Sequence, residues 1–100
     1  MIKVKVTKDS DMIKSVSILG HAMYADFGKD IVCSAASSVV TTTINGILSF
    51  DKEGLSYEVS KDGLVIKNIK TDNITQTLLN NMISLLKDLE KDYPTNVEVK

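Results

Sequence analysis

The sequence predicts an α+β fold in which two helices pack on one face of a mostly antiparallel sheet, with the elements in the order ββαββαβ. Two pairs of segments, in which apolar and polar residues alternate, predict two hairpins. Two longer segments have apolar residues at helical spacing, and the only proline follows the second of them. Because two helices cannot cover both faces of such a sheet, we expect them on one face. The other face or the central helix is then available for dimerisation.

The first two strands are expected to form a hairpin at the start of the chain. Ile2, Val4 and Val6 alternate with polar residues, and Val16 and Ile18 do the same after a polar turn at residues 8–11. This period of two is typical of strands with one buried face.

A long helix is expected from Ile31 to about Phe50, with Asp30 as its N-cap. The β-branched run at 39–44 and Gly46 oppose it, since glycine costs roughly 1 kcal/mol relative to alanine in a helix. Twenty residues are nevertheless too many for one strand, and the apolar spacing fits a buried helix face. The apolar positions cover more than one side, so this helix is predicted to be central or shared with a second subunit.

A second hairpin and helix complete the predicted single domain, residues 1–100. Residues 55–59 and 64–69 flank a turn at 60–63, Asp72 or Asn73 caps the helix, Pro94 ends it, and residues 96–100 can add a last strand. Gln76 is assigned to the polar face of this helix. The apolar stripe opposite it consists of Ile74, Leu78, Leu79, Met82, Leu85, Leu86 and Leu89.

Composition narrows the class of protein. Charged residues make up 25% and hydrophobic ones 43%, as in soluble globular chains. A formal charge of -1 and the absence of tryptophan give no indication of direct contact with nucleic acid. No apolar run approaches a membrane span and no signal peptide is evident, so we predict a cytoplasmic protein without a membrane partner. One Cys and one His argue against a disulfide or zinc site, and neither a metal nor a cofactor is expected.

The only histidine, His21, and the only cysteine, Cys33, stand twelve positions apart. An imidazole can take the proton of a nearby thiol and so create a strong nucleophile. If Asp30 caps the helix, Cys33 is its third residue, where unpaired amides and the helix dipole favour a thiolate. The same amides could hold the oxyanion formed in acyl transfer. The pair therefore has the composition of a catalytic dyad.

Further residues around this pair are candidates for supporting roles. Ser37 follows Cys33 by one helical turn and could contact the thiol or a substrate. Asp30 could orient His21 or only cap the helix, and the sequence leaves both open. The segment between the pair is unusually apolar, as expected of a contact surface or cover, and its candidate residues are Met23, Tyr24, Phe27 and Gly28.

Ordinary structural roles explain the same residues. A lone cysteine in an apolar helix is usually a small buried hydrophobe, and a lone histidine beside glycine is usually a turn or surface residue. Ser37 could bond back to a helix carbonyl, and Tyr24 and Phe27 could pack on the core. On the residue types alone these alternatives remain open.

The strings Gly20-His21-Ala22 and Gly28-Lys29-Asp30-Ile31-Val32-Cys33, followed by Ser37, resemble the signature of the ribosomal-processing cysteine proteases, small bacterial proteins of about this length. The resemblance implies Cys33 as nucleophile, His21 as general base, Asp30 and Ser37 as supporting residues, and a segment from Met23 to Gly28 that orders over the substrate. It also implies a homodimer that removes the N-terminal extension of the large-subunit ribosomal protein numbered twenty-seven through a thioester. The chain departs from the family's usual pattern after the cysteine at Ser34 and Ala36, which are small, helix-compatible changes.

Two other function classes compete with a protease. A non-catalytic ribosome-associated module could hold a peptide with the same segment. Redox signalling through the single thiol would require an intermolecular partner and does not explain His21.

Overall fold

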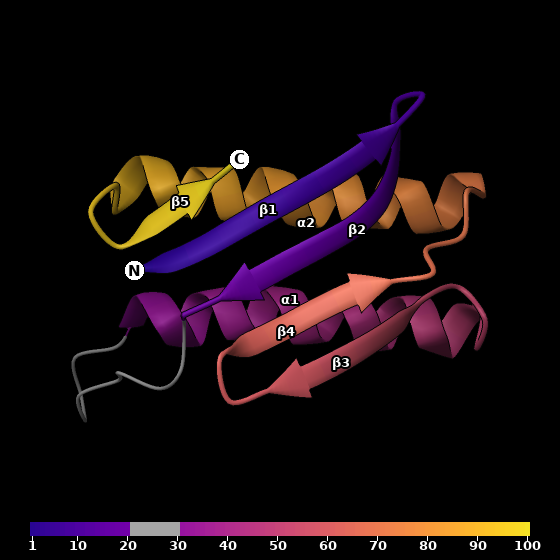
Figure 1. Cartoon of the computed structure of the whole chain (residues 1–100), viewed down its shortest axis with the longest axis horizontal. Helices are drawn as coiled ribbons and strands as arrows, with labels where there is room; N and C mark the ends of the chain where they lie inside the picture. Colours follow the sequence, from indigo (N-terminus) through magenta and orange to yellow (C-terminus); the bar gives the residue numbers. More distant parts are fainter. Residues whose placement is uncertain (21–30) are drawn as a thin grey trace.

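The structure is a computed structural model that describes residues 1–20 and 31–100. The elements are β1 (Ile2–Asp9), β2 (Met12–Leu19), α1 (Ile31–Phe50), β3 (Ser56–Ser60), β4 (Gly63–Lys67), α2 (Asn73–Asp92) and β5 (Val97–Val99). The sheet has the strand order β3-β4-β2-β1-β5, with β5 parallel to β1 and every other pair antiparallel. Both helices lie behind the sheet, α1 on the β4 side and α2 on the β1 side (Figure 1). The predicted fold class and element order are confirmed.

The core lies between the two helices and the face of the sheet that they cover. Val4 on β1 and Val16 on β2 are almost fully buried, whereas their neighbour Lys5 is exposed. Burying apolar surface contributes roughly 25 cal/mol per Å². The alternation seen in the sequence therefore fixes which face of each strand meets the helices. The buried apolar residues include Ile2, Val4, Ile13, Val16, Ile18, Ile44, Ile47, Ile66, Leu79, Met82, Leu86 and Val97.

The two hairpins turn over two residues each, more tightly than the sequence indicated. Ser10 and Asp11 both have positive φ, 52° and 65°, which is the backbone of a type I′ turn. This turn matches the right-handed twist of the strands on either side, so β1 and β2 extend to its edges. The second hairpin places Lys61 and Asp62 between β3 and β4.

Gln76 is the clearest correction to the sequence analysis. The helical pattern assigns it to the polar face of α2, but its side chain is only 6% exposed and faces the sheet. Its Oε1 accepts from the Ile13 amide at 2.8 Å, and its Nε2 donates to the carbonyls of Ile13 and Lys70, each at 3.0 Å. Because β4 pairs with β2 only at residues 16–19, Ile13 has no strand partner on β4, and the Gln76 amide takes that place. Conversely, Ile74 and Leu85 from the predicted stripe are more than 40% exposed.

Replacing this amide is expected to destabilise the protein. In Gln76→Leu the buried backbone groups of Ile13 lose their partner, and each such group costs about 1–3 kcal/mol. We expect a loss of about 3 kcal/mol in the free energy of unfolding, measured by urea denaturation. Thr77→Leu is the matched control, because Thr77 is the exposed neighbour on α2. Equal stability of the two variants would contradict the role assigned to Gln76.

The ends of α2 agree with the sequence. Asp72 is the N-cap, and its side chain accepts from the Thr75 amide at 3.2 Å. Thr75, first through its side chain and then through its amide, holds the pKa of Asp72 below its usual range. The helix ends at Asp92 with Tyr93 as C-cap, and Pro94 follows, where it cannot continue the helix.

The first helix spans Ile31–Phe50, as predicted, while its predicted cap Asp30 lies outside the described residues. Its inner face is formed by Cys33, Ala36, Val40, Ile44 and Ile47. By length and composition α1 could cross a membrane, which corrects the expectation that no apolar run approaches that length. The core helix of a soluble protein meets the same criteria, and α1 packs against both α2 and the sheet.

Candidate active site

Cys33 occupies the first turn of α1, as its third helical residue. Its side chain is 6% exposed and belongs to the core cluster between helix and sheet, whereas the adjacent Ser34 is exposed. The first turn of a helix carries backbone amides without helical acceptors and the positive end of the dipole. The fold thus places the thiol of the only cysteine where negative charge is favoured.

Three segments meet at this end of the molecule, on the left of Figure 1: the start of α1, the end of β2 and the β3–β4 turn. The Gly20 amide, just after β2, donates to the Asp62 carbonyl of that turn at 2.8 Å. Gly20 has a φ of 81°, and a Cβ there would stand 2.6 Å from the Met1 carbonyl oxygen. The backbone position from which the chain leaves β2 is therefore fixed, and it requires glycine.

Ser37 lies one turn after Cys33 on α1 and is half-buried. It lines a cavity of about 200 Å³ between α1 and the strands. The cavity is mostly apolar, and we call it the α1–β3 groove. Its lining residues are Ile18, Ala36, Ser37, Val40, Thr41, Val59 and Leu64.

Ser34 and Ala36 lie on different sides of α1. Ser34 is exposed, whereas Ala36 is 1% exposed and forms part of the groove wall. Ser34 therefore lies outside the core, while Ala36 contributes to the wall of the groove.

Several predicted site residues lie outside the described part of the chain: His21, Met23, Tyr24, Phe27, Gly28 and Asp30. The distance between His21 and Cys33 and the role of Asp30 accordingly remain predictions. Of the candidate set, the structure places Cys33 and Ser37 on successive turns of one helix. Sequence reasoning missed the groove residues on the strands. The alternation of Tyr57 and Val59 in the sequence agrees with their position on the helix side of β3, but it does not show that a groove forms there.

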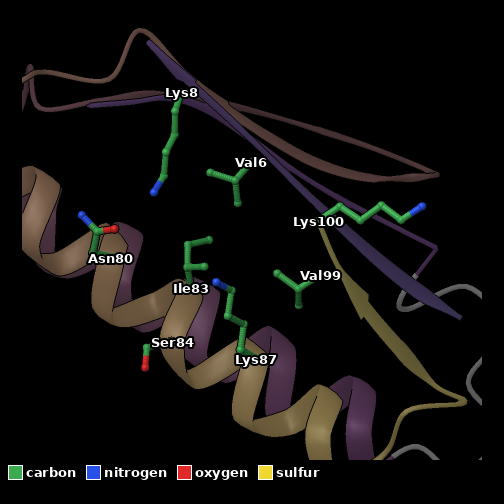
Figure 2. Close-up of a pocket in the computed structure, with 8 residues that line it drawn as sticks. All are labelled: Val6, Lys8, Asn80, Ile83, Ser84, Lys87, Val99 and Lys100. Carbon is green, nitrogen blue, oxygen red and sulfur yellow. The ribbon is translucent and has the colours of Figure 1, made fainter. Parts of the chain in front are cut away.

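A larger cavity, of about 400 Å³, lies elsewhere, between α2, β1 and β5. Figure 2 shows the side chains of Lys8 and Lys87 directed toward it over Val6, Ile83 and Val99, while Lys100 points away. This cavity shares no lining residue with α1 or with the α1–β3 groove. Size alone therefore does not identify the active site, because the larger cavity is built from elements that do not carry Cys33.

Asp51, Lys70 and Asp72 have shifted pKa values, and they lie after the end of α1, after β4 and at the start of α2. Just after α1 ends, a hydrogen bond from the Lys70 ammonium lowers the pKa of Asp51, and the same bond raises the pKa of Lys70. The pair joins the two connections that follow α1 and β4, so its role is structural. Among residues 1–20 and 31–100, no group of three His, Cys, Asp or Glu side chains is arranged to hold a metal ion.

Comparison with known proteins gives matches over nearly the whole chain. The family model described as cysteine protease Prp matches residues 1–98. The ribosomal processing cysteine protease Prp of Staphylococcus aureus is 30% identical, with 99% of this chain and 97% of that protein covered. The protein of the same description from Bacillus subtilis is 26% identical, with 99% and 96% covered.

Solved structures agree with the sequence matches. The crystal structure of the essential ribosomal processing protease Prp from S. aureus, in complex with a covalently linked product peptide, superposes with a TM-score of 0.88 at 28% identity. The superposition covers 100% of this chain and 98% of the S. aureus chain. A second structure of that protease, in complex with a substrate peptide, has the same TM-score, identity and coverage.

Proposed function

This chain belongs to the Prp family of cysteine proteases, and from that premise we propose that its residues 1–100 act as one domain that processes a ribosomal protein. The proposed substrate is the precursor of the large-subunit ribosomal protein numbered twenty-seven, from which a short N-terminal extension is removed. The reaction needs neither cofactor nor metal and takes place in the cytoplasm, without direct contact with nucleic acid or membrane.

One observation carries the assignment of residues. A cysteine protease requires a cysteine nucleophile, and this chain contains a single cysteine, Cys33, placed at the start of α1. It also contains a single histidine, so His21 is the one imidazole that can act as general base. The count of residues and the position of Cys33 on α1 therefore support the same dyad.

The proposed reaction proceeds through a thioester. The Cys33 thiolate attacks the scissile carbonyl carbon, and the first-turn amides of α1 stabilise the oxyanion of the tetrahedral intermediate. The imidazolium of His21 then gives its proton to the leaving amine, and the C–N bond breaks. A water molecule, deprotonated by His21, attacks the thioester and releases the carboxylate and the thiol. Asp30 and Ser37 support this pair, and the segment with Met23, Tyr24, Phe27 and Gly28 covers the substrate.

The test is incubation of the purified protein with a synthetic peptide that spans the extension of the precursor from the same organism. Mass spectrometry should detect two fragments from one cut, and a peptide of scrambled sequence should stay intact. An intact substrate peptide after prolonged incubation at micromolar enzyme would contradict the proposed substrate.

We also propose that the protein is a homodimer. The most apolar window of α1 is only 28% buried, and α1 exposes Ile31 and Phe50 at its two ends. A helix of such apolar composition with so little of it covered is typical of an interface between subunits. Light scattering should give twice the chain mass of 11.0 kDa. A mass of one chain at micromolar concentration would contradict the dimer.

The burial of Cys33 favours one alternative, a peptide-binding module in which Cys33 is a buried structural residue. The two functions differ in the reactivity of the thiol. A protease should be alkylated by iodoacetamide under native conditions, with a rate that follows thiolate formation as the pH rises, whereas a packed cysteine should react only after unfolding.

A further inference from the structure

The cavity between α2, β1 and β5, which we call the β1–α2 cavity, opens where the sheet has no further strand. β1 spans Ile2–Asp9, but β5 pairs with it only at residues 2–4. Beyond Lys100, no strand among the described residues lies beside the second half of β1 on that side. The space of about 400 Å³ between this part of β1 and α2 is therefore left open (Figure 2).

Lys8 stands at a position of β1 that the alternation assigns to the core. Ile2, Val4 and Val6 occupy every second position on the side of the strand that faces the helices, and Lys8 is the next residue in this series. Ile2 and Val4 are almost fully buried, whereas Lys8 is exposed. The Lys8 side chain therefore extends from the helix side of β1 toward the β1–α2 cavity, as Figure 2 shows.

α2 directs a second ammonium group toward the same cavity. In Figure 2 the side chains of Lys87 and Lys8 both extend toward it, one from the helix and one from the strand. Val6, Ile83 and Val99 form an apolar base beneath them, and Ile83 is only 8% exposed. The cavity thus combines two positive charges with an apolar surface.

The two charges are not balanced by the part of the chain that the structure describes. No Asp or Glu side chain of that part lines the cavity, and neither Lys8 nor Lys87 forms an ion pair within it. Two ammonium groups directed into one space repel each other. An anion between them offsets this repulsion and accepts a charge-assisted hydrogen bond from each. The apolar base adds a preference for an anion that carries an apolar body.

Protection of the sheet edge is another role for Lys8. Beyond the end of β5, β1 is an edge of the sheet, and a lysine directed inward from such an edge hinders pairing with a second chain. That role requires Lys8 alone. It gives no reason for Lys87 on α2 to extend toward the same cavity, whereas an anionic ligand accounts for both side chains.

We propose that the β1–α2 cavity is a binding site for a small organic anion, in which a carboxylate or phosphate group meets Lys8 and Lys87 and an apolar body lies on Ile83. The cavity volume is within the usual range of small-molecule sites, about 300–1,000 Å³. The site shares no lining residue with α1, which carries Cys33. The inference therefore goes beyond the proposed function and does not depend on it.

Binding is tested by an NMR titration of isotope-labelled protein with phenyl phosphate at about pH 7.5, where the probe is a dianion because its second pKa is about 6. We expect amide shifts at Val6, Lys8 and Lys87 and a Kd of about 5 mM or lower. Phenylacetate is titrated in the same way, and the tighter of the two probes identifies the head group. Inorganic phosphate lacks the apolar body and benzyl alcohol lacks the charge, so each should bind at least about 10-fold more weakly.

Substitution of the two lysines tests the contacts. Lys8→Met and Lys87→Met should each raise the Kd for phenyl phosphate at least about threefold, because each removes one of the two charges. Lys87→Arg keeps the charge and should bind within about twofold of wild type. Lys91→Met is the matched control, because Lys91 is an exposed lysine one turn further along α2 that does not line the cavity. Its Kd should change by less than about 1.5-fold.

Several results would overturn the site. They are an unchanged Kd in Lys8→Met and Lys87→Met, an equal rise in Lys91→Met, amide shifts confined to α1, and no binding of either anionic probe at about 50 mM. Benzyl alcohol binding as tightly as phenyl phosphate would also overturn it, since apolar contact alone would then explain the binding. None of these measurements involves peptide cleavage. Their failure leaves the proposed function standing, and a protein that cleaves no peptide can still show the site.

Discussion

Cys33→Ala should abolish peptide cleavage. With the only thiol removed no thioester can form, and loss of a covalent nucleophile lowers turnover by at least about 10³-fold. The change removes one sulfur from a side chain that is 6% exposed, so the native fold should persist with a modestly lower Tm. Cleavage is followed by mass spectrometry on the purified variant, and the fold is checked by circular dichroism.

Two further variants test whether the loss of cleavage comes from the missing nucleophile. Ser34→Ala changes the exposed neighbour of Cys33 on α1 and should retain activity. His21→Ala should also be inactive while leaving the fold intact, because it removes the only imidazole. Normal cleavage by purified Cys33→Ala protein would refute the mechanism, and inactivity of Ser34→Ala would point to disruption of the helix start rather than to loss of the nucleophile.

Gly63→Ala should strongly destabilise the protein. A Cβ at this position would stand 2.1 Å from the Ile18 carbonyl oxygen and 2.8 Å from the Leu19 Cα, both in the backbone of β2. The φ of 148° is also one that alanine rarely adopts. Overpacking and backbone strain together lead us to expect a loss of about 3 kcal/mol or more in the free energy of unfolding.

The same change should reduce activity in the folded fraction. Gly63 pairs with Leu19 at the end of β2, beside the hydrogen bond from Gly20 to Asp62. Pushing β4 away from β2 would displace the point from which the chain continues toward His21. Reduced kcat/KM per folded molecule, with the folded fraction determined by chemical denaturation, checks this expectation.

Gly46→Ala is the matched control, because it makes the same chemical change at a helical glycine. A Cβ at Gly46 would meet no atom of another described segment within 4 Å, so alanine fits on α1 without displacing a neighbour. Its higher helix propensity should stabilise the protein by roughly 1 kcal/mol. Opposite signs for the two substitutions would show that the surroundings of each glycine decide its effect, and equal stability of Gly63→Ala and wild type would contradict the packing argument.

The helices and strands could be predicted because their signals are local. The alternation around Val4 and Val16 and the cap at Asp72 followed by Pro94 lie within a few residues of the elements they define. The face of Gln76 could not be predicted in this way. Its burial depends on the backbone of Ile13, sixty-three positions away, which needs a partner because β4 is short.

The candidate site, too, could be predicted only in part from the sequence. The sequence identified Cys33 and placed it at a helix start, because the number of cysteines and the helical spacing after Cys33 can be read from the sequence itself. The α1–β3 groove was not visible there, since its walls come from α1 and three strands that meet only when the sheet forms.

The sequence by itself therefore determined the fold class, the order of the elements and the identity of the only possible cysteine nucleophile. The tertiary structure decided that Cys33 faces the core, that β3 is an open edge, and that an apolar groove begins one turn from the thiol. The physical reason is the separation along the chain of the residues that determine each property. Strand and helix periods and the count of a residue type are properties of neighbouring positions, whereas burial, sheet order and cavity shape arise from contacts between segments far apart in the chain.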